Sequence, residues 1–234
     1  MKKIILCFLI LLTTQSLVAQ KIILHRNAGG DQTYQLSSVD SISFQPFVCG
    51  DEIRYEGKTY HTVLIGTQCW MKVNLNVGTM IDGPSISPTG KQTNNQIIEK
   101  YCYDNDTANC STYGGLYEWN EAMQYVTTPG ARGICPEGWH IPISTEFQTL
   151  ITTVGGDGNA LLANRTNSSG FSLLLSGYVH IAFEELEVHS FNYSSNSSGV
   201  NATYMYVYGI PSPPTISFFS NWKWYGMSIR CLKN

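Results

Sequence analysis

The polar segment YDNDTAN is the clearest candidate for metal chemistry in this sequence. Asp104 and Asp106 lie two residues apart and Asn109 follows, so three side chains can supply the oxygen ligands that Ca²⁺ prefers. The alternative is an acidic loop between Cys102 and Cys110 that holds no ion. Calcium is therefore a candidate cofactor, and no other cofactor is expected.

The sequence shows no catalytic constellation. The five histidines lack the spacing of metal ligands, and the chain has no nucleophile elbow, zinc-protease helix motif, phosphate loop or dinucleotide glycine signature. His140 is interpreted as a structural, hydrogen-bonded residue. Carboxylates such as Glu118 and Glu121 are present, but nothing pairs them across a cleft for glycoside hydrolysis. We therefore expect a protein that is not an enzyme.

The cysteines favour a disulfide framework. Cys7 lies in an N-terminal apolar run, and the rest of the chain holds six cysteines. An even number in an exported chain favours disulfides over metal binding or thiol catalysis. Six cysteines allow 15 pairings, which sequence alone does not distinguish. Closeness along the chain suggests Cys49 with Cys69 and Cys102 with Cys110, which leaves Cys135 with Cys231.

The segment from Val188 to Ile229 has one formally charged residue, Lys223, among many Tyr, Trp, Ser and Asn residues. The alternation in TYMYVYG predicts a strand in which the tyrosines share one face and Met205 and Val207 share the other. If the Met/Val face meets the core, the tyrosines point outward together. Antibody paratopes use the same combination of rigid aromatic and adaptable polar side chains, although an ordinary half-buried strand also favours tyrosine. The candidate ligand-binding residues are Asn192, Tyr193, Tyr204, Tyr206, Tyr208, Asn221, Trp222, Trp224 and Tyr225.

The elements that would position these residues follow the order strands, two helices, strands. Residues 21–47 predict a small unit of three short strands, and RYEGKTYHTVLIGTQCW predicts a hairpin. Helices are predicted in GGLYEWNEAMQYV and in PISTEFQTLITTVGG, where Thr145 and Gln148 are spaced as a capping box. Short strands are predicted in GFSLLLSGYV, TYMYVYG, TISFF and GMSIRCL. This order is an α+β pattern, unlike the alternating strands and helices of a parallel α/β sheet.

Residues 1–19 have the layout of a secretory signal peptide: two lysines, an apolar run and small residues ending at Ala19. The run is too short to span a bilayer, and no other segment is long and apolar enough. We therefore expect an exported protein at the cell surface or outside the cell, with a short β extension at 20–47 and a main domain at 48–234. Removing Lys2 and Lys3 leaves 12 of the 14 basic residues against 17 acidic ones, which argues against a nucleic-acid partner.

Several long motifs resemble, in order, the Fibrobacter succinogenes major paralogous domain, a family common in exported proteins of gut-type bacteria. The resemblance runs from about Val48 to Lys233. It implies a C-type-lectin-like fold related to formylglycine-generating enzyme, braced by disulfides, with two main helices and short, mostly antiparallel strands. The motifs are CGDEIRYEGKTYHTVLIGTQCWMKVNL, YCYDNDTANCSTYGGLYEWNEAM, GICPEGWHIPISTEFQTL, GFSLLLSGY and YGMSIRCLK.

The resemblance implies function only broadly. Some relatives are surface or pilus-associated adhesins, and some are targets of retroelements that diversify a ligand-binding face. We therefore expect an exported, adhesin- or lectin-like binding module that recognises a glycan or protein through its uncharged C-terminal face, and that is a candidate for such diversification. A structural or tip subunit of a surface appendage is the first alternative. The second is a formylglycine-generating-enzyme-like or hydrolytic enzyme.

Overall fold

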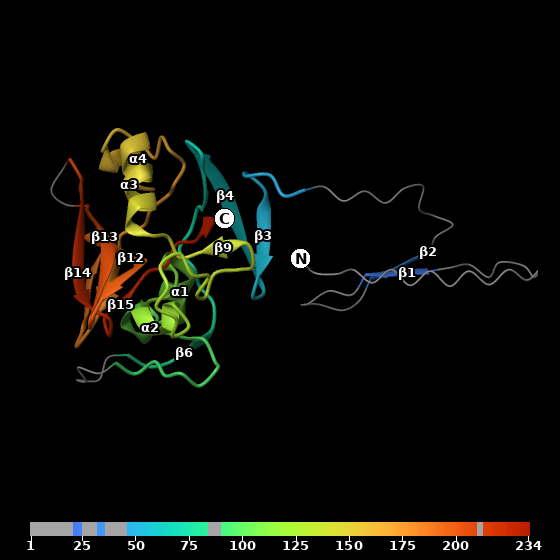
Figure 1. Ribbon diagram of the computed structural model, residues 1–234, viewed down its shortest axis with the longest axis horizontal. Helices are drawn as coiled ribbons and strands as arrows, with labels where there is room; N and C mark the ends of the chain where they lie inside the picture. The colour runs from blue at the N-terminus through green and yellow to red at the C-terminus, as the bar shows by residue number, and fades with distance from the viewer. Residues whose placement is uncertain (1–20, 25–31, 36–45, 84–89, 210–212) are drawn as a thin grey trace, which may run out of the picture. The chain divides into compact units, whose positions relative to one another are not determined.

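The computed structural model describes two compact units of the chain, which divide between Pro46 and Phe47 (Figure 1). In the first unit, strand β1 (Lys21–Leu24) pairs antiparallel with β2 (Gln32–Gln35). The predicted signal peptide and the third short strand of this unit lie outside the described residues. The structure describes residues 21–24, 32–35, 46–83, 90–209 and 213–234.

The second unit has α+β architecture, with many strands and a few short helices (Figure 1). One five-stranded sheet, in the order β3, β4, β5, β16, β9, brings the two ends of this unit together. Gly57 and Gly66, in the turns between its first strands, have positive φ, which glycine adopts without strain. The predicted hairpin is therefore confirmed. The strands are β3 (Glu52–Tyr55), β4 (Lys58–Ile65), β5 (Gln68–Met71), β9 (Trp139–His140) and β16 (Leu232–Lys233).

A seven-stranded sheet holds most of the C-terminal half of the chain. Its order is β14, β13, β12, β10, β15, β8, and β11 also pairs with β10, so β14 is an edge strand. Residues 79–80 and 99–100 add a short parallel pair, β6 (Thr79–Met80) with β7 (Glu99–Lys100). The sheet contains β8 (Tyr117–Glu118), β10 (Ser176–Val179), β11 (Phe183–Leu186), β12 (His189–Ser198), β13 (Asn201–Tyr208), β14 (Thr215–Trp222) and β15 (Gly226–Met227).

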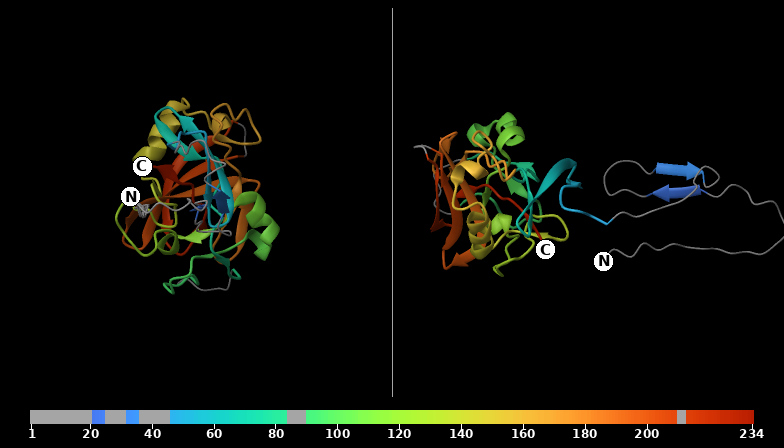
Figure 2. Two further views of the ribbon diagram at one scale, coloured as in Figure 1. Left: turned by 90° about the vertical axis from the view of Figure 1, so that its right-hand side faces the viewer. Right: turned by 90° about the horizontal axis from the view of Figure 1, so that it is seen from above.

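The longest helix, α3 (Ser144–Thr153), was correctly predicted and lies beside β12 and β13 (Figure 2). It buries Phe147 and Leu150. The predicted capping box is wrong, because the Glu146 carboxylate, not Gln148, accepts the N–H of Ile143, at 2.9 Å. Helix α4 (Gly158–Leu161) follows it.

The helix predicted over GGLYEWNEAMQYV is mostly wrong. Only α2 (Trp119–Ala122) is helical there, because Tyr117 and Glu118 are extended and pair with Met227 and Gly226. Leu116, Trp119 and Met123 have helical spacing because they are buried before, within and after this short helix. A helix that was not predicted, α1 (Thr107–Tyr113), follows the short 3₁₀ turn η2 (Tyr103–Asn105) in the acidic segment.

The core is braced by three disulfides: Cys49–Cys69, Cys102–Cys110 and Cys135–Cys231. All three suggested pairs are confirmed. The last pair joins residues 96 positions apart and ties the C-terminal segment to the middle of the domain. In the part of the chain described, no helix combines the length and apolar character needed to cross a membrane.

Candidate functional site

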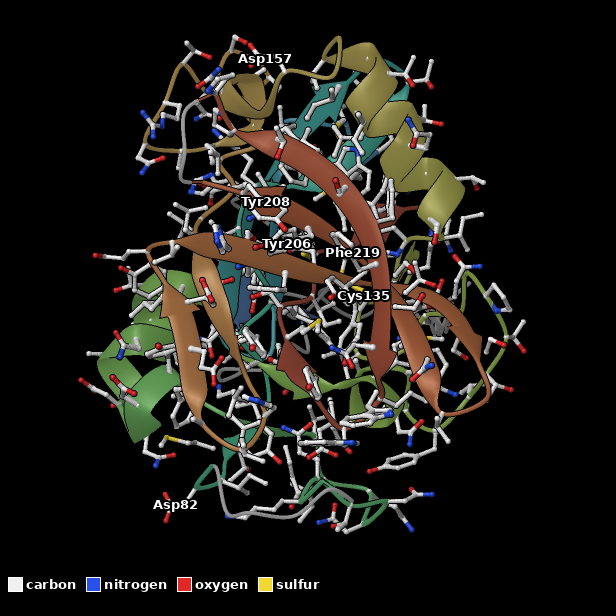
Figure 3. All side chains as sticks on the ribbon, turned by 90° about the vertical axis from the view of Figure 1, so that its left-hand side faces the viewer. Asp82, Cys135, Asp157, Tyr206, Tyr208 and Phe219 are labelled. Carbon is white, nitrogen blue, oxygen red and sulfur yellow. A yellow bond between two sulfur atoms is a disulfide. The ribbon has the colours of Figure 1, made fainter. Side chains whose placement is uncertain are left out.

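The strand β13 separates two kinds of side chain. Met205 and Val207 are fully buried, in the same apolar cluster as Phe147 of α3. Tyr206 and Tyr208 lie on the opposite face, where Figure 3 shows them close to Phe219 of β14. The predicted division of β13 into an apolar core face and a tyrosine face is therefore confirmed.

The tyrosines of this face are less exposed than predicted. Tyr204 and Tyr206 are each only 7% exposed. The ring of Tyr206 packs against the rings of Phe191 and Tyr208, with 4.7 Å and 4.0 Å between ring centroids. The two arrangements are tilted and edge-on, which aromatic pairs favour. Burial raises the pKa of Tyr206. The expectation of three freely exposed tyrosines is wrong, because the rings cover each other.

Two further residues expected to touch a ligand lie in the interior. Asn192 and Tyr193 of β12 are fully buried. The Asn192 amide donates to Ser190 Oγ, at 2.8 Å, and the Tyr193 hydroxyl donates to the carbonyl of Tyr225, at 2.9 Å. Tyr193 thus holds the loop after β14 from the interior of the domain. Both residues are placed to hold the site and not to contact a ligand.

The end of β14 and the loop after it carry a cluster of stacked aromatic rings. Trp222 is 48% exposed and stacks on Trp224, with 5.5 Å between ring centroids and 19° between planes. Trp224 stacks in turn on His180, at 6.3 Å. Asn221 accepts the backbone N–H of Trp222, at 2.8 Å, and Tyr225 stacks nearby on Tyr178. Of the residues predicted for binding, Trp222 and Trp224 are therefore best placed for stacking on a ligand.

The backbone of this loop is fixed on three sides. The N–H of Trp119 donates to the carbonyl of Lys223, and the N–H of Lys223 donates to the carbonyl of Val200, both at 2.9 Å. The Tyr193 hydroxyl holds Tyr225 from a third direction. Segments from α2, from the turn between β12 and β13, and from β12 itself thus position the loop before any ligand arrives.

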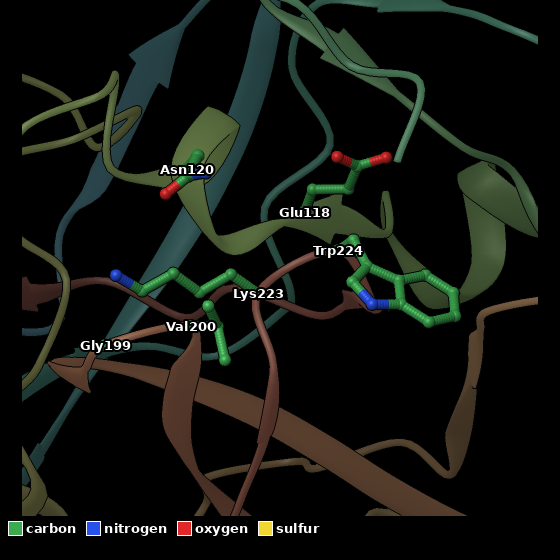
Figure 4. Close-up of a pocket in the computed structure, with 6 residues that line it drawn as sticks. All are labelled: Glu118, Asn120, Gly199, Val200, Lys223 and Trp224. Atoms are coloured by element: carbon green, nitrogen blue, oxygen red, sulfur yellow. The ribbon is translucent and has the colours of Figure 1, made fainter. Parts of the chain in front are cut away.

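A pocket of about 300 Å³ opens beside this loop (Figure 4). Three parts of the chain meet there: the end of β8 and start of α2, the turn between β12 and β13, and the loop after β14. Of the predicted site residues only Trp224 lines it. One signal for the others is visible in the sequence, the lone charge of Lys223 in an uncharged segment. The pocket is lined by Glu118, Asn120, Gly199, Val200, Lys223 and Trp224.

Glu118 is the acidic group of this pocket, and it is 5% exposed. Its Oε1 accepts hydrogen bonds from the Tyr101 hydroxyl and from the backbone N–H groups of Lys91, at 2.7 Å, and Gln92, at 3.3 Å. Its Oε2 accepts no hydrogen bond from any residue that the structure describes. Burial raises the pKa of this carboxyl group, although the three donors partly offset that effect.

Lys223 is the basic group of the pocket. Its ammonium lies 4.3 Å from the centre of the Trp119 ring, a cation–π geometry, and no carboxylate in the described ranges lies within ion-pair distance of it. Partial burial lowers the pKa of Lys223. In Figure 4 its side chain extends toward Asn120, at the opposite end of the pocket from the Glu118 carboxylate.

A second hollow, of about 490 Å³, lies elsewhere, between residues 163–164 and 173–175. Its one carboxylate, Glu187, already accepts the hydroxyl proton of Tyr113, at 2.7 Å. The remaining lining is mostly aliphatic. No tryptophan is among the described residues that line it.

The residues of the candidate calcium loop have local structural roles. Asp106 begins α1, and its carboxylate accepts the N–H of Ala108, at 2.8 Å. The Asn109 amide donates to the carbonyl of Tyr103, at 2.9 Å. Asp104 lies in η2 with a positive φ of 53°. Among the described residues, no three His, Cys, Asp or Glu side chains are grouped for a metal ion.

The chain was compared with known proteins and families. The model of the Fibrobacter succinogenes major domain matches residues 63–233. No curated protein and no solved structure matches the chain. The match covers all the strands of the seven-stranded sheet and the whole pocket.

Proposed function

This chain belongs to the Fibrobacter succinogenes major domain family, and on that premise we propose that it is an exported, adhesin- or lectin-like module that binds a glycan. Its fold is proposed to be C-type-lectin-like. Support for this fold comes from the sheet that joins the two ends of the domain, the disulfide brace and the ligand-sized pocket among the C-terminal loops. Localisation at the cell surface or outside the cell agrees with three disulfides.

The observation that carries the proposal is the combination of stacked indoles with a pocket that contains polar groups. Trp222 and Trp224 offer flat apolar faces, and Glu118, Asn120 and Lys223 supply hydrogen-bond acceptors and donors beside them. Small-molecule sites have this composition, with apolar walls and a few placed polar groups. A pyranose ring, which has an apolar face and a polar rim, fits such a surface.

The fixed backbone of the loop adds to the case. Ordering a side chain or loop on binding costs about 0.5–1.5 kcal/mol for each immobilised side chain. Because backbone hydrogen bonds at Lys223 and Tyr225 already hold the loop, the cost of ordering its backbone is largely absent at binding.

The proposal is tested by a glycan-array screen of the purified domain and of the variant Trp222→Ala/Trp224→Ala. We expect the parent to bind a defined group of glycans and the variant to lose that binding. Leu64→Ala is the matched control, because Leu64 is an exposed apolar residue of β4, in the other sheet. Loss of binding in the control as well, or unchanged binding in the tryptophan variant, would contradict the proposed site.

A second candidate function, an assembly subunit of a surface appendage, is favoured by β14. This edge strand has eight residues and no charge among them. Proteins usually protect long edge strands with charged residues or proline, because the unpaired backbone groups can add another strand. Sedimentation of the parent and of Ser220→Lys over a range of concentrations tests this function. Self-association that Ser220→Lys abolishes would support it, and a parent that stays monomeric would count against self-assembly through β14.

A further inference from the structure

We infer that the pocket beside Trp224 takes an acidic sugar residue, whose carboxylate pairs with Lys223 while a ring hydroxyl donates to Glu118. This inference rests on the proposed function and names its ligand class. The apolar face of the sugar ring would lie on Trp224 and Val200, which line the same pocket.

The first argument is that two opposite charges line one pocket without ion partners. Glu118 and Lys223 both belong to its wall, yet they do not pair with each other or with any other described residue. Hydrogen bonds already satisfy Oε1 of Glu118, whereas the partly buried charge of Lys223 has no carboxylate partner among the described residues. A ligand carboxylate would supply the opposite charge to Lys223, and a ligand hydroxyl would donate to the carboxylate of Glu118.

The second argument is the state of the Glu118 carboxylate. Three donors fix its Oε1, so its orientation is set, whereas Oε2 has no donor in the part of the chain described. A carboxylate oxygen in this position accepts a hydrogen bond, and a sugar hydroxyl donates one.

The third argument is the position of Lys223. Its stem lies along the pocket, and its ammonium is held over the Trp119 ring, near Asn120. The ammonium can still accept an anion, because a cation–π contact satisfies its charge only in part. A neutral sugar would leave this charge unpaired, and a cationic ligand would be repelled by it. A ligand with a carboxylate near Lys223 and a hydroxyl donor near Glu118 satisfies both side chains.

The fourth argument is the placement of the two charges. Figure 4 shows the Glu118 carboxylate and the Lys223 ammonium on opposite sides of the pocket, with Trp224 on the side of Glu118 and Val200 beside Lys223. A sugar acid separates its carboxylate from its far hydroxyls by the width of the ring.

The test is calorimetric titration of the purified protein with a galacturonic acid trisaccharide and with the matching neutral galactose trisaccharide. We expect the acidic trisaccharide to bind at least about tenfold more tightly at low salt, a preference that falls as salt is added. Lys223→Gln should remove the preference, and Glu118→Gln should weaken binding of both sugars. Lys58→Gln, at the exposed first residue of β4, is the matched control and should retain the preference.

Three results would overturn the inference: equal affinity for the two trisaccharides, an acidic preference that persists in Lys223→Gln, or no binding of the acidic trisaccharide at millimolar concentration. The proposed function fails by a different result, the absence of any glycan whose binding depends on Trp222 and Trp224. Circular dichroism and thermal melting of each variant separate a loss of binding from a loss of folding.

Discussion

Gly90 lies directly against the carboxylate of Glu118: a Cβ atom at Gly90 would stand 2.1 Å from Glu118 Oε2. The φ of Gly90 is +79°, which also favours glycine. The segment after residue 89 thus packs its backbone onto the one acidic group of the pocket. The two neighbouring N–H groups, of Lys91 and Gln92, both donate to that carboxylate.

We expect Gly90→Ala to destabilise the protein and to disturb the pocket. The added methyl group must displace either the Glu118 carboxylate or the backbone that binds it. Gly57→Ala is the matched control, because Gly57 has a similar φ of +73° but open space around its Cβ position. The control should lose about 1–2 kcal/mol from backbone strain alone. Gly90→Ala should lose about 1–3 kcal/mol more. Urea denaturation measures both, and equal losses would show that Glu118 is not held by this contact.

The disulfides should contribute unequally to stability. On the chain-entropy estimate, a loop of about 100 residues stabilises by about 4.7 kcal/mol and one of about 10 residues by less than 3 kcal/mol. Replacing Cys135 and Cys231, which lie 96 positions apart, with alanine should therefore cost more than replacing Cys102 and Cys110, which lie 8 apart. Guanidinium unfolding of the two double variants gives the comparison. A larger loss from the short loop would contradict the entropic account.

The pair His140 and Glu146 should make stability depend on pH. Burial alone would lower the pKa of His140, but hydrogen bonds to Glu146, at 2.9 Å, and Asn234, at 2.7 Å, outweigh it and raise the pKa. A raised histidine pKa contributes stability that is complete below about pH 6.5 and is lost as pH rises through the folded-state pKa. The melting temperature should accordingly decrease across this range in the parent.

His140→Gln should flatten that pH dependence. Substitution of His61, whose side chain is 61% exposed, by glutamine serves as the control and should leave the dependence in place. Thermal melts at several pH values between 5.5 and 8.5 give the two slopes. Identical slopes in the parent and in His140→Gln would refute the assignment.

Lys100 should make stability depend on pH in the opposite direction and at higher pH. Burial, and to a smaller extent the charge of Lys58, lowers its pKa from 10.5 to about 8, and its ammonium donates to Asn76 Oδ1, at 2.7 Å. Between these two pH values the unfolded chain binds more protons than the folded one, so stability from this group rises with pH. Relative to Lys100→Met, the parent should gain roughly 2 kcal/mol from pH 7.5 to pH 10. Urea unfolding at both pH values checks the sign, and a parent that loses stability relative to the variant would reverse it.

Much of the fold could be predicted from local patterns, and the failures have physical causes. The alternation of β13 and the apolar stripe of α3 are strong because each buries one face. β12 was not predicted, because its Ser and Asn residues favour neither strand nor helix by themselves. Its structure comes from pairing with β13 along most of its length. The helix predicted over GGLYEWNEAMQYV failed because buried residues on two sides of a short helical turn imitate the apolar stripe of a longer helix.

The candidate site could be predicted only in part, because it is assembled from distant segments. Trp222 and Trp224 were predicted from composition; Trp222 is exposed, and Trp224 lines the pocket. Glu118 was not predicted, because nothing near it in the sequence shows that it meets Lys223 and Trp224. Glu118 is brought to Lys223 and Trp224 by the pairing of β8 with β15, in which Glu118 lies opposite Gly226. Both strands are too short to be recognised in the sequence.

The bond between Cys135 and Cys231 also has a mechanical consequence. If tension acts between residue 47 and the C-terminal strand, this bond carries it past every residue from 136 to 230. The turn at Gly199 and Val200 and the loop with Lys223 and Trp224 lie inside the bypassed stretch. Tension applied between these two points would thus leave these loops unstretched. Single-molecule pulling should show a longer extension on unfolding after reduction of the disulfides, and equal extensions would refute this.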